Sequence, residues 1–95
     1  MVVIYTQKFM EELRNIADFI ALDSQDRADE FSAKLKTEIN KIYPMPYRFK
    51  MNEKLNREDT RNLIFKGYTI VFRIGKSEIK ILAIFKNNKH KYSNT

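Results

Sequence analysis

Hydrophobic residues follow two different periods along the 95-residue chain, and each change of period marks a new element. The run VVIY at positions 2–5 is β-branched and aromatic, which predicts a short strand. Apolar residues then recur every three or four positions, which predicts an amphipathic helix. Its apolar stripe consists of Phe9, Leu13, Ile16, Ala17 and Ile20.

A second helical stripe follows after a short polar break. Asp23 or Ser24 can cap this helix, because either side-chain oxygen can accept from an unpaired backbone N–H group. The helix must end near Tyr43, since Pro44 disfavours helical geometry at the residue before it. Two helices joined this closely predict an antiparallel hairpin. The second stripe consists of Ala28, Phe31, Leu35, Ile39 and Ile42.

The segment from residue 44 to 60, PMPYRFKMNEKLNREDT, has no sustained period and predicts a loop with at most a short helical turn. Beyond it come three strand-like runs: RNLIFK (61–66), YTIVFRI (68–74) and SEIKILAIF (77–85). Gly67 and Gly75 lie between these runs and can supply the positive φ of tight hairpin turns. The three runs therefore predict an antiparallel meander.

The resulting order is β-α-α-β-β-β, which predicts an α+β fold. The N-terminal strand and the helical hairpin pack on one face of an antiparallel sheet. The length of 95 residues suits one compact domain, so residues 1–95 are expected to form a single unit.

Strict alternation along the last two strands predicts one apolar face and one mixed face. The apolar face, expected to meet the helices, consists of Tyr68, Ile70, Phe72, Ile74, Ile79, Ile81, Ala83 and Phe85. The mixed face consists of Thr69, Val71, Arg73, Lys80, Leu82 and Ile84. An apolar surface with a cationic margin predicts a docking site for a chain with hydrophobic and acidic side chains. Alternatively, the loop 44–60 or the C-terminal tail covers this face.

Charge is distributed unevenly along the chain, although its net value is only +6. Residues 1–43 hold 6 basic and 8 acidic groups, whereas residues 44–95 hold 12 basic and 4 acidic groups. The second half therefore favours polyanions or acidic proteins as partners.

Composition excludes several kinds of site. The chain has no cysteine, which rules out disulfides and thiolate metal sites, and its one histidine, His90, makes an imidazole metal site improbable. We expect no cofactor and no metal. Apolar runs are far shorter than the roughly 20 residues that cross a bilayer, and the first residues lack a signal-peptide pattern. The expected location is the cytoplasm, without a membrane partner.

No nucleophile–base motif, P-loop or dinucleotide-binding glycine pattern is present. The remaining chemistry lies in a cationic and aromatic set, which can hold phosphates and stabilise developing negative charge. Metal-free RNA cleavage through the 2′-hydroxyl is therefore conceivable. This set consists of Arg48, Lys50, Lys54, Arg57, Arg61, Arg73, Lys86, Lys89, His90, Lys91 and Tyr92.

Two stretches resemble the RelE/ParE superfamily of bacterial toxins. The first, IYTQKFMEELRNIADFIALDSQDRADEFSAKLKTEINKI, is similar to that superfamily's strand and helical hairpin. The second, RNLIFKGYTIVFRI followed by EIKILAIFK, is similar to its last three strands. The resemblance implies a toxin of a type II toxin–antitoxin system. Its partner would be a cognate antitoxin, in a heterodimer or heterotetramer.

The resemblance leaves two targets open. ParE-type toxins poison DNA gyrase, whereas RelE-type toxins cut mRNA in the ribosomal A site without a metal. RelE-type nucleases carry Arg where this chain has Thr69, and Arg where it has Lys86. Arg61 matches the arginine that ParE-type toxins carry at the start of the sheet. The ParE-type reading is therefore favoured over the RelE-type reading.

Each reading assigns its own residues. A RelE-type ribonuclease would use Tyr92, Lys86 and Lys54 for catalysis. A gyrase inhibitor would not be an enzyme. A third reading, a plain nucleic-acid-binding module, rests on the basic second half alone. The residues expected to contact the target or the antitoxin are Arg61, Val71, Arg73, Lys80, Leu82, Ile84, Lys89 and His90.

Overall fold

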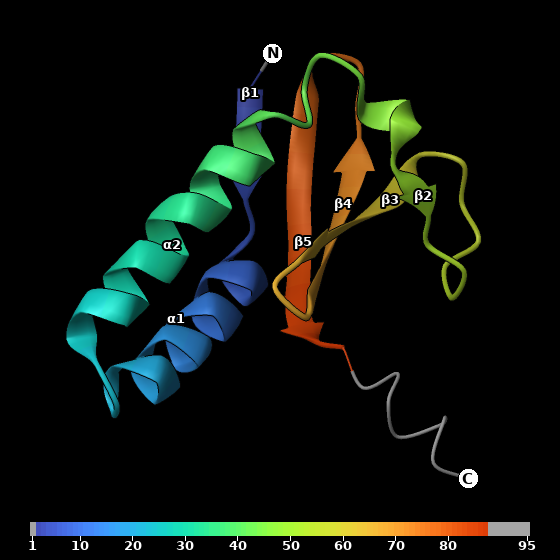
Figure 1. Cartoon of the computed structure of the whole chain (residues 1–95). Coiled ribbons are helices and arrows are strands. Elements are labelled where there is room, and N and C mark those ends of the chain that lie inside the picture. The colour runs from blue at the N-terminus through green and yellow to red at the C-terminus, as the bar shows by residue number, and fades with distance from the viewer. Residues whose placement is uncertain (1, 88–95) are drawn as a thin grey trace, which may run out of the picture.

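The computed structural model describes residues 2–87, and their elements follow the order that the hydrophobic pattern predicts (Figure 1). The α+β fold class is confirmed. The structure adds a 3₁₀ turn, η1, and a two-residue strand, β2, inside the predicted loop. The elements are β1 (Val2–Tyr5), α1 (Gln7–Ala21), α2 (Gln25–Asn40), η1 (Pro46–Arg48), β2 (Lys50–Met51), β3 (Thr60–Phe65), β4 (Tyr68–Ile74) and β5 (Glu78–Lys86).

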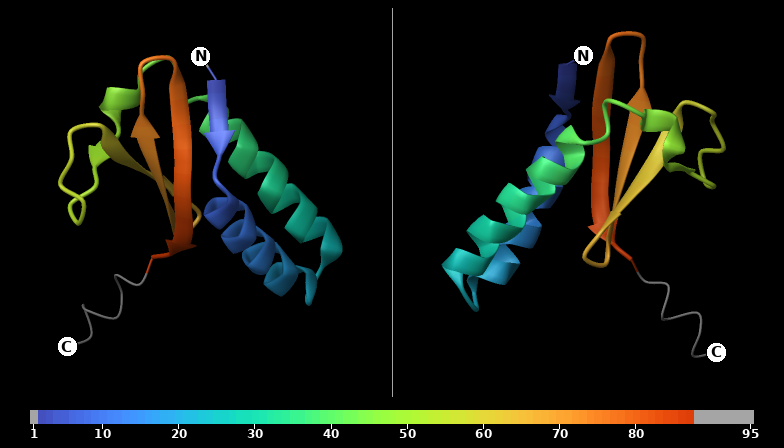
Figure 2. Two further views of the ribbon diagram at one scale, coloured as in Figure 1. Left: turned by 180° about the vertical axis from the view of Figure 1, so that it is seen from behind. Right: turned by 45° about the horizontal axis from the view of Figure 1, so that its top comes forward.

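Both helices begin at a hydroxyl cap. The Thr6 Oγ1 accepts from the Phe9 N–H at 3.2 Å, and the Ser24 Oγ accepts from the Arg27 N–H at 3.2 Å. Ser24, rather than Asp23, is therefore the cap of α2. The two helices form a hairpin that lies to one side of the sheet in all three views (Figures 1 and 2).

Within residues 2–87 the sheet has five strands, in the order β1-β5-β4-β3-β2. The three pairings from β2 to β5 are antiparallel, as predicted. The prediction of a wholly antiparallel sheet is wrong at one edge, because β1 pairs with β5 in parallel. Residues 6–77, which include both helices and β2 to β4, connect β1 with β5, and a connection of this length allows parallel pairing.

The two glycine turns serve different purposes. Gly67 has a φ of +84° and follows Lys66 at +48°, so the β3–β4 turn has the left-handed backbone expected of a tight hairpin. Gly75 does not have a positive φ, and that part of the prediction is wrong. A Cβ at Gly75 would lie 3.0 Å from the Cγ of Glu78, so this glycine allows close packing instead.

A β-bulge in β5 changes which residues face the helices. Val71 pairs with Ala83 and Phe72 pairs with Ile81, so Leu82 is an extra residue in β5. Ile84 consequently enters the core with 2% exposure, whereas Phe85 turns away and is 48% exposed.

The bulge corrects the alternation predicted from sequence for the second half of β5. The assignments of Ile79 and Ile81 to the core are confirmed. Those of Ala83 and Phe85 to the helix side, and of Ile84 to the mixed face, are wrong.

Side chains from the start of α1 meet the bulged strand where β1 no longer covers it. Thr6 Oγ1 donates to the carbonyl oxygens of Ile81 at 2.8 Å and Leu82 at 3.2 Å. The Glu12 carboxylate accepts from the Ile84 N–H at 3.0 Å. These contacts give polar partners to backbone groups of β5 at and beyond the end of its pairing with β1.

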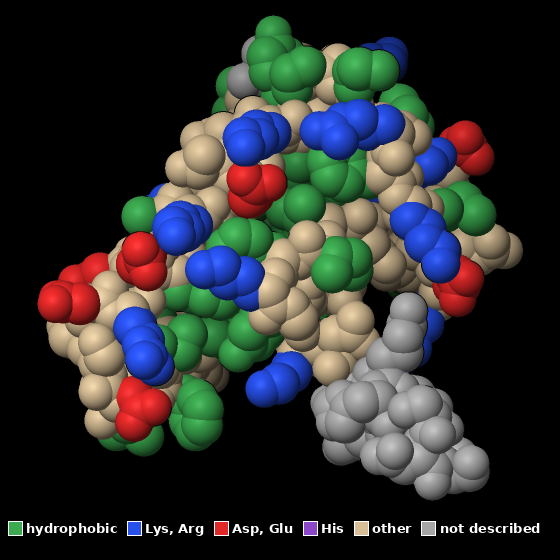
Figure 3. Space-filling view, in the orientation of Figure 1, with side chains coloured by type: hydrophobic (Ala, Val, Ile, Leu, Met, Phe, Trp, Pro, Cys, Tyr) green, Lys and Arg blue, Asp and Glu red, His purple; other side chains and the backbone are tan. Residues whose placement is uncertain are grey.

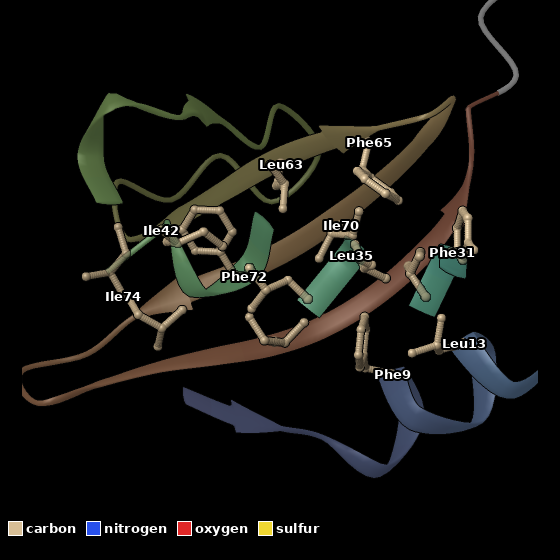
Figure 4. Packing of buried hydrophobic residues seen from close by; sticks show 14 residues of the cluster. Phe9, Leu13, Phe31, Leu35, Ile42, Leu63, Phe65, Ile70, Phe72 and Ile74 are labelled. Atoms are coloured by element: carbon tan, nitrogen blue, oxygen red, sulfur yellow. The ribbon is translucent and has the colours of Figure 1, made fainter. Parts of the chain in front are cut away.

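The core lies between the helical hairpin and the sheet (Figure 4). Phe9 and Leu13 of α1 and Phe31 and Leu35 of α2 belong to one buried cluster, which also contains residues of β3, β4 and β5. Phe72 is fully buried at the middle of β4, and its ring meets the Phe49 ring edge to face, with centroids 5.4 Å apart. The core therefore also fixes the start of the segment that leads into β2.

Candidate interaction surface

The side of the sheet away from the helices is the mixed face, called here the sheet back. Paired residues share a face, so the registers of β3, β4 and β5 define its members. They are Asn62, Ile64, Thr69, Val71, Arg73, Lys80, Ala83 and Phe85.

The sheet back has a buried floor and exposed apolar walls. Thr69 and Val71 are buried on β4, whereas Ile64 and Phe85 on the flanking strands are exposed. Beside them, Lys50 and Lys54 help to line a crevice of about 300 Å³. Residues 50–54 line this crevice together with Ile64, Thr69 and Phe85, so the segment 44–60 lies against one part of the sheet back and leaves Ile64 and Phe85 exposed. The C-terminal tail, the other expected cover, lies outside the described residues.

The predicted cations of the sheet back, Arg73 and Lys80, lie where β4 ends and β5 begins. Arg73 and Lys80 are directly paired across β4 and β5. The Arg73 Nε donates to the Thr60 Oγ1 at 3.2 Å, and the Lys80 Nζ lies 3.9 Å from a Glu78 oxygen. Both side chains are half-buried. An apolar centre with cations at its margin is the arrangement expected for a protein contact.

Asp59 joins the loop to this cationic end. The Arg57 guanidinium donates to both of its carboxylate oxygens, at 3.1 and 2.9 Å. These hydrogen bonds hold the pKa of Asp59 below its usual value, helped by the Thr60 hydroxyl and the charges of Arg57 and Arg73. Partial desolvation opposes this shift.

We expect replacement of Asp59 by asparagine to reduce the loss of stability in acid. A lowered folded-state pKa stabilises the fold above the unfolded-state value, and this contribution disappears as pH falls through the folded-state pKa. Urea unfolding of both proteins at about pH 6 and about pH 3 measures the difference. An equal drop in the free energy of unfolding for Asp59→Asn and the wild type would contradict the role of Asp59.

Arg61, a predicted contact residue, is largely enclosed. Its guanidinium donates to the backbone oxygens of Tyr47, Phe49 and Glu58, at 3.4, 3.0 and 2.9 Å. It also donates to the Glu58 carboxylate at 3.2 Å and lies over the Tyr47 ring at 5.1 Å. The Arg61 side chain is only 12% exposed. Most of its donors are therefore used inside the protein.

The structure separates two of the three candidate catalytic residues. Lys54 borders the crevice on the sheet back. Lys86 lies on the helix side of β5, with its Nζ 6.0 Å from the centre of the Tyr68 ring. It lines a groove of about 450 Å³ between α1 and β5, together with Glu12 and Phe19. Tyr92, the third candidate, lies outside the described residues, as do the predicted contacts Lys89 and His90.

No group of three or more His, Cys, Asp or Glu side chains within residues 2–87 is placed to hold a metal ion. Over the same range, no helix is long and apolar enough to cross a membrane.

Comparison with known proteins identifies the family. The sequence profile described as "ParE toxin of type II toxin-antitoxin system, parDE" matches residues 3–90. The chain belongs to the ParE toxin family. Its resemblance to the RelE/ParE superfamily is thereby confirmed, on the ParE side. This family implies a ParD antitoxin as partner.

A solved structure supports the fold of the toxin independently. A chain from the structure titled "Chromosomal ParDE TA system from P. aeruginosa" superposes with a TM-score of 0.75 at 19% sequence identity. The match covers 93% of the toxin and 97% of that chain. No curated protein matches the sequence.

Sequence reasoning missed two parts of the surface. The groove beside β5 depends on the bulge and on the end of β1, neither of which alternation reveals. The ordered path of residues 43–59 depends on Arg61, whose fork of donors reaches residues on both sides of β2. The density of Tyr, Pro and Arg in PMPYRF was the available signal, because rigid aromatic segments are common at interfaces.

Proposed function

We propose that the toxin inhibits growth by binding and poisoning DNA gyrase, and that the antitoxin neutralises it by covering the same surface. Membership of the ParE family makes gyrase the first target to test. The observation that carries the proposal is the sheet back, where exposed Ile64 and Phe85 lie beside Lys50 and Lys54. This combination suits a protein partner with apolar and acidic side chains.

The arrangement favours binding over catalysis. Lys54 and Lys86, which would act together in a ribonuclease, line different hollows on opposite sides of the sheet. A general acid–base pair must reach the same reacting group, within about 3 Å of the proton that each one moves. Inhibition through binding needs no such convergence.

Reversing one charge on the sheet back is expected to weaken gyrase inhibition. In Lys80→Glu, about tenfold more toxin should be needed to half-inhibit supercoiling, because like charges at an interface repel. Lys34→Glu is the matched control. It makes the same exchange on the exposed face of α2, where Lys34 pairs with Glu30 at 3.4 Å. Supercoiling by purified gyrase measures both variants.

Two results would contradict the proposal. One is unchanged supercoiling with wild-type toxin, without a trapped cleavage complex. The other is the appearance of new 5′ ends at A-site codons when translated mRNA is analysed by primer extension. The second result would favour the ribonuclease, with Lys54, Lys86 and Tyr92 as the residues to replace.

A further inference from the structure

Three large side chains are exposed where the chain leaves α2 and enters η1. Tyr43, Met45 and Tyr47 are 48, 62 and 53% exposed, and we call them the loop platform. In Figure 3, hydrophobic side chains gather beside lysines and arginines at the upper end of the molecule, above α2 and toward η1. The platform is next to the edge strand β2, so a partner on the sheet back can reach it around that edge.

The platform is held at its first end by buried and cyclic residues. Ile42 is fully buried, and its carbonyl accepts from the Met45 N–H at 3.2 Å. Pro44 and Pro46 flank Met45, and each ring fixes its own φ. Segments restricted in this way lose less conformational entropy when they bind a partner.

Arg61 holds the platform at its second end. Its guanidinium lies over the Tyr47 ring and donates to the Tyr47 and Phe49 carbonyl oxygens. The Phe49 ring is anchored against Phe72 in the core. Tyr47 is therefore an exposed ring on a fixed backbone, which is the usual property of an aromatic anchor at an interface.

The rest of the loop is fixed by Asn52. Its backbone N–H donates to the Thr60 carbonyl at 2.9 Å, and its side-chain amide donates to the Asn62 side-chain oxygen at 2.9 Å. Its own side-chain oxygen accepts from the Leu55 N–H at 2.9 Å. These three hydrogen bonds of Asn52 fix the backbone of the segment that follows the platform and connect it to the start of β3.

The platform lies in basic surroundings. Residues 41–61 hold six basic and three acidic groups. Each acid has a basic neighbour: Glu53 with Lys50, Glu58 with Arg61 and Asp59 with Arg57. Within residues 2–87, Arg48 and Lys54 have no acidic partner within ion-pair distance. Charge complementarity therefore favours an acidic partner.

We infer that the loop platform is a second contact surface for the toxin's protein target, and that Arg61 is the positioning residue that presents it. This inference rests on the proposed function, because it assumes that the toxin acts by binding a protein. The partner is a protein surface that offers an apolar recess for Tyr47 and Met45, with carboxylates near Arg48.

The composition of the platform favours a protein over a nucleic acid. Tyrosine could stack on bases, but the exposed carboxylates of Glu53 and Glu58 lie in the same loop and would repel phosphates. Met45, between the two tyrosines, adds an apolar contact that a phosphate backbone cannot use. Tyr, Met and Arg together are enriched in protein interfaces.

The first test replaces the exposed side chains singly. Tyr47→Ser and Met45→Ser are each expected to require about tenfold more toxin for growth arrest, as judged from induction level, because central interface anchors lose at least this much on truncation. Both should bind the cognate antitoxin and unfold thermally as the wild type does. Leu22→Ser is the matched control, since Leu22 is 84% exposed at the tip of the helical hairpin, away from the platform.

Three outcomes would overturn the inference. Growth arrest by Tyr47→Ser at wild-type induction shows that the platform is not a target contact. If Tyr47→Ser loses antitoxin binding and the ability to arrest growth to the same extent, the platform is an antitoxin contact or a structural element. Specific loss of duplex DNA binding, measured by fluorescence anisotropy, makes it a nucleic-acid surface.

The second test separates positioning by Arg61 from direct contact. Arg61→Lys keeps the charge but loses the planar fork that reaches Tyr47, Phe49 and Glu58. We expect trypsin to cleave after Lys54 and Arg57 several times faster in Arg61→Lys than in the wild type or in Tyr47→Ser, with growth arrest weakened. Unchanged cleavage with weakened arrest would make Arg61 a contact residue and overturn its positioning role.

Failure of the inference can be told apart from failure of the proposed function. If wild-type toxin arrests growth without affecting gyrase, and Tyr47→Ser weakens that arrest, gyrase is the wrong target. The inference that the platform contacts the toxin's target is then retained. If wild-type toxin poisons gyrase and Tyr47→Ser does so equally, the platform is not a target contact, and the proposal that gyrase is the target is retained. A wild-type chain that neither arrests growth nor inhibits gyrase overturns both.

Discussion

Replacement of Ile84 by aspartate is expected to destabilise the toxin by several kcal/mol, comparable to the roughly 5–15 kcal/mol that holds a domain of this kind together. The side chain of Ile84 is 2% exposed, opposite Ile70 on the core side of the sheet. The substitution removes buried apolar contacts and leaves a carboxylate without a cationic partner in the core.

Phe85→Asp is the matched control for Ile84→Asp. Its side chain points to the sheet back and is nearly half exposed, so a loss of about 1 kcal/mol or less is expected. Urea unfolding followed by circular dichroism measures both variants. Regular alternation along β5 would give the reverse order, and that order would show that the bulge at Leu82 is absent.

Replacement of Phe72 by alanine is expected to cost about 3–5 kcal/mol. Its ring is fully buried at the centre of β4, and its truncation leaves a cavity that the surrounding strands can only partly close. The edge-to-face contact with Phe49 is lost as well, which adds about 0.5–1.5 kcal/mol. Because Phe49 precedes β2, the segment beneath the loop platform should loosen.

Phe72→Leu preserves most of the volume and separates these effects. A loss of about 1–2 kcal/mol is expected, since a buried hydrophobic side chain of similar size remains. Faster tryptic cleavage after Lys54 should accompany Phe72→Ala more than Phe72→Leu. If the two variants unfold at the same urea concentration, the Phe49–Phe72 contact does not contribute to stability in the way that the geometry indicates.

Residues that obey one period over a long stretch were predictable from sequence. The stripes that contain Phe9 and Leu35 hold for at least about three turns each, so one irregular position does not change the helix assignment. The cap at Ser24 and the turn at Gly67 follow from local chemistry that needs no distant partner. This part of the fold positions the sheet back.

The facing of β5 after Leu82 could not be read from alternation. One inserted residue reverses the faces of all residues that follow, and Ile84 and Phe85 are both acceptable core residues by composition. The contacts that hold the bulge come from Thr6 and Glu12, more than 70 positions earlier. Only the folded arrangement brings these groups together.

The position of Arg61 shows the same limit for the candidate site. Its match to the arginine of ParE-type toxins suggested a contact residue, yet its guanidinium is turned inward by the oxygens of Tyr47, Phe49 and Glu58. No local pattern shows that the chain brings Tyr47 back into contact with Arg61, which is 14 positions later. The parallel pairing of β1 escaped prediction for the same reason, since register across a long crossover has no local signal.

The pairing of β1 with β5 also has a consequence for synthesis. Val2 lies opposite Glu78, so β1 has no neighbouring strand until β5 has left the ribosome. A chain interrupted before residue 78 lacks β5, which joins β1 to the rest of the sheet. Incomplete translation products that lack β5 are therefore expected to remain unfolded.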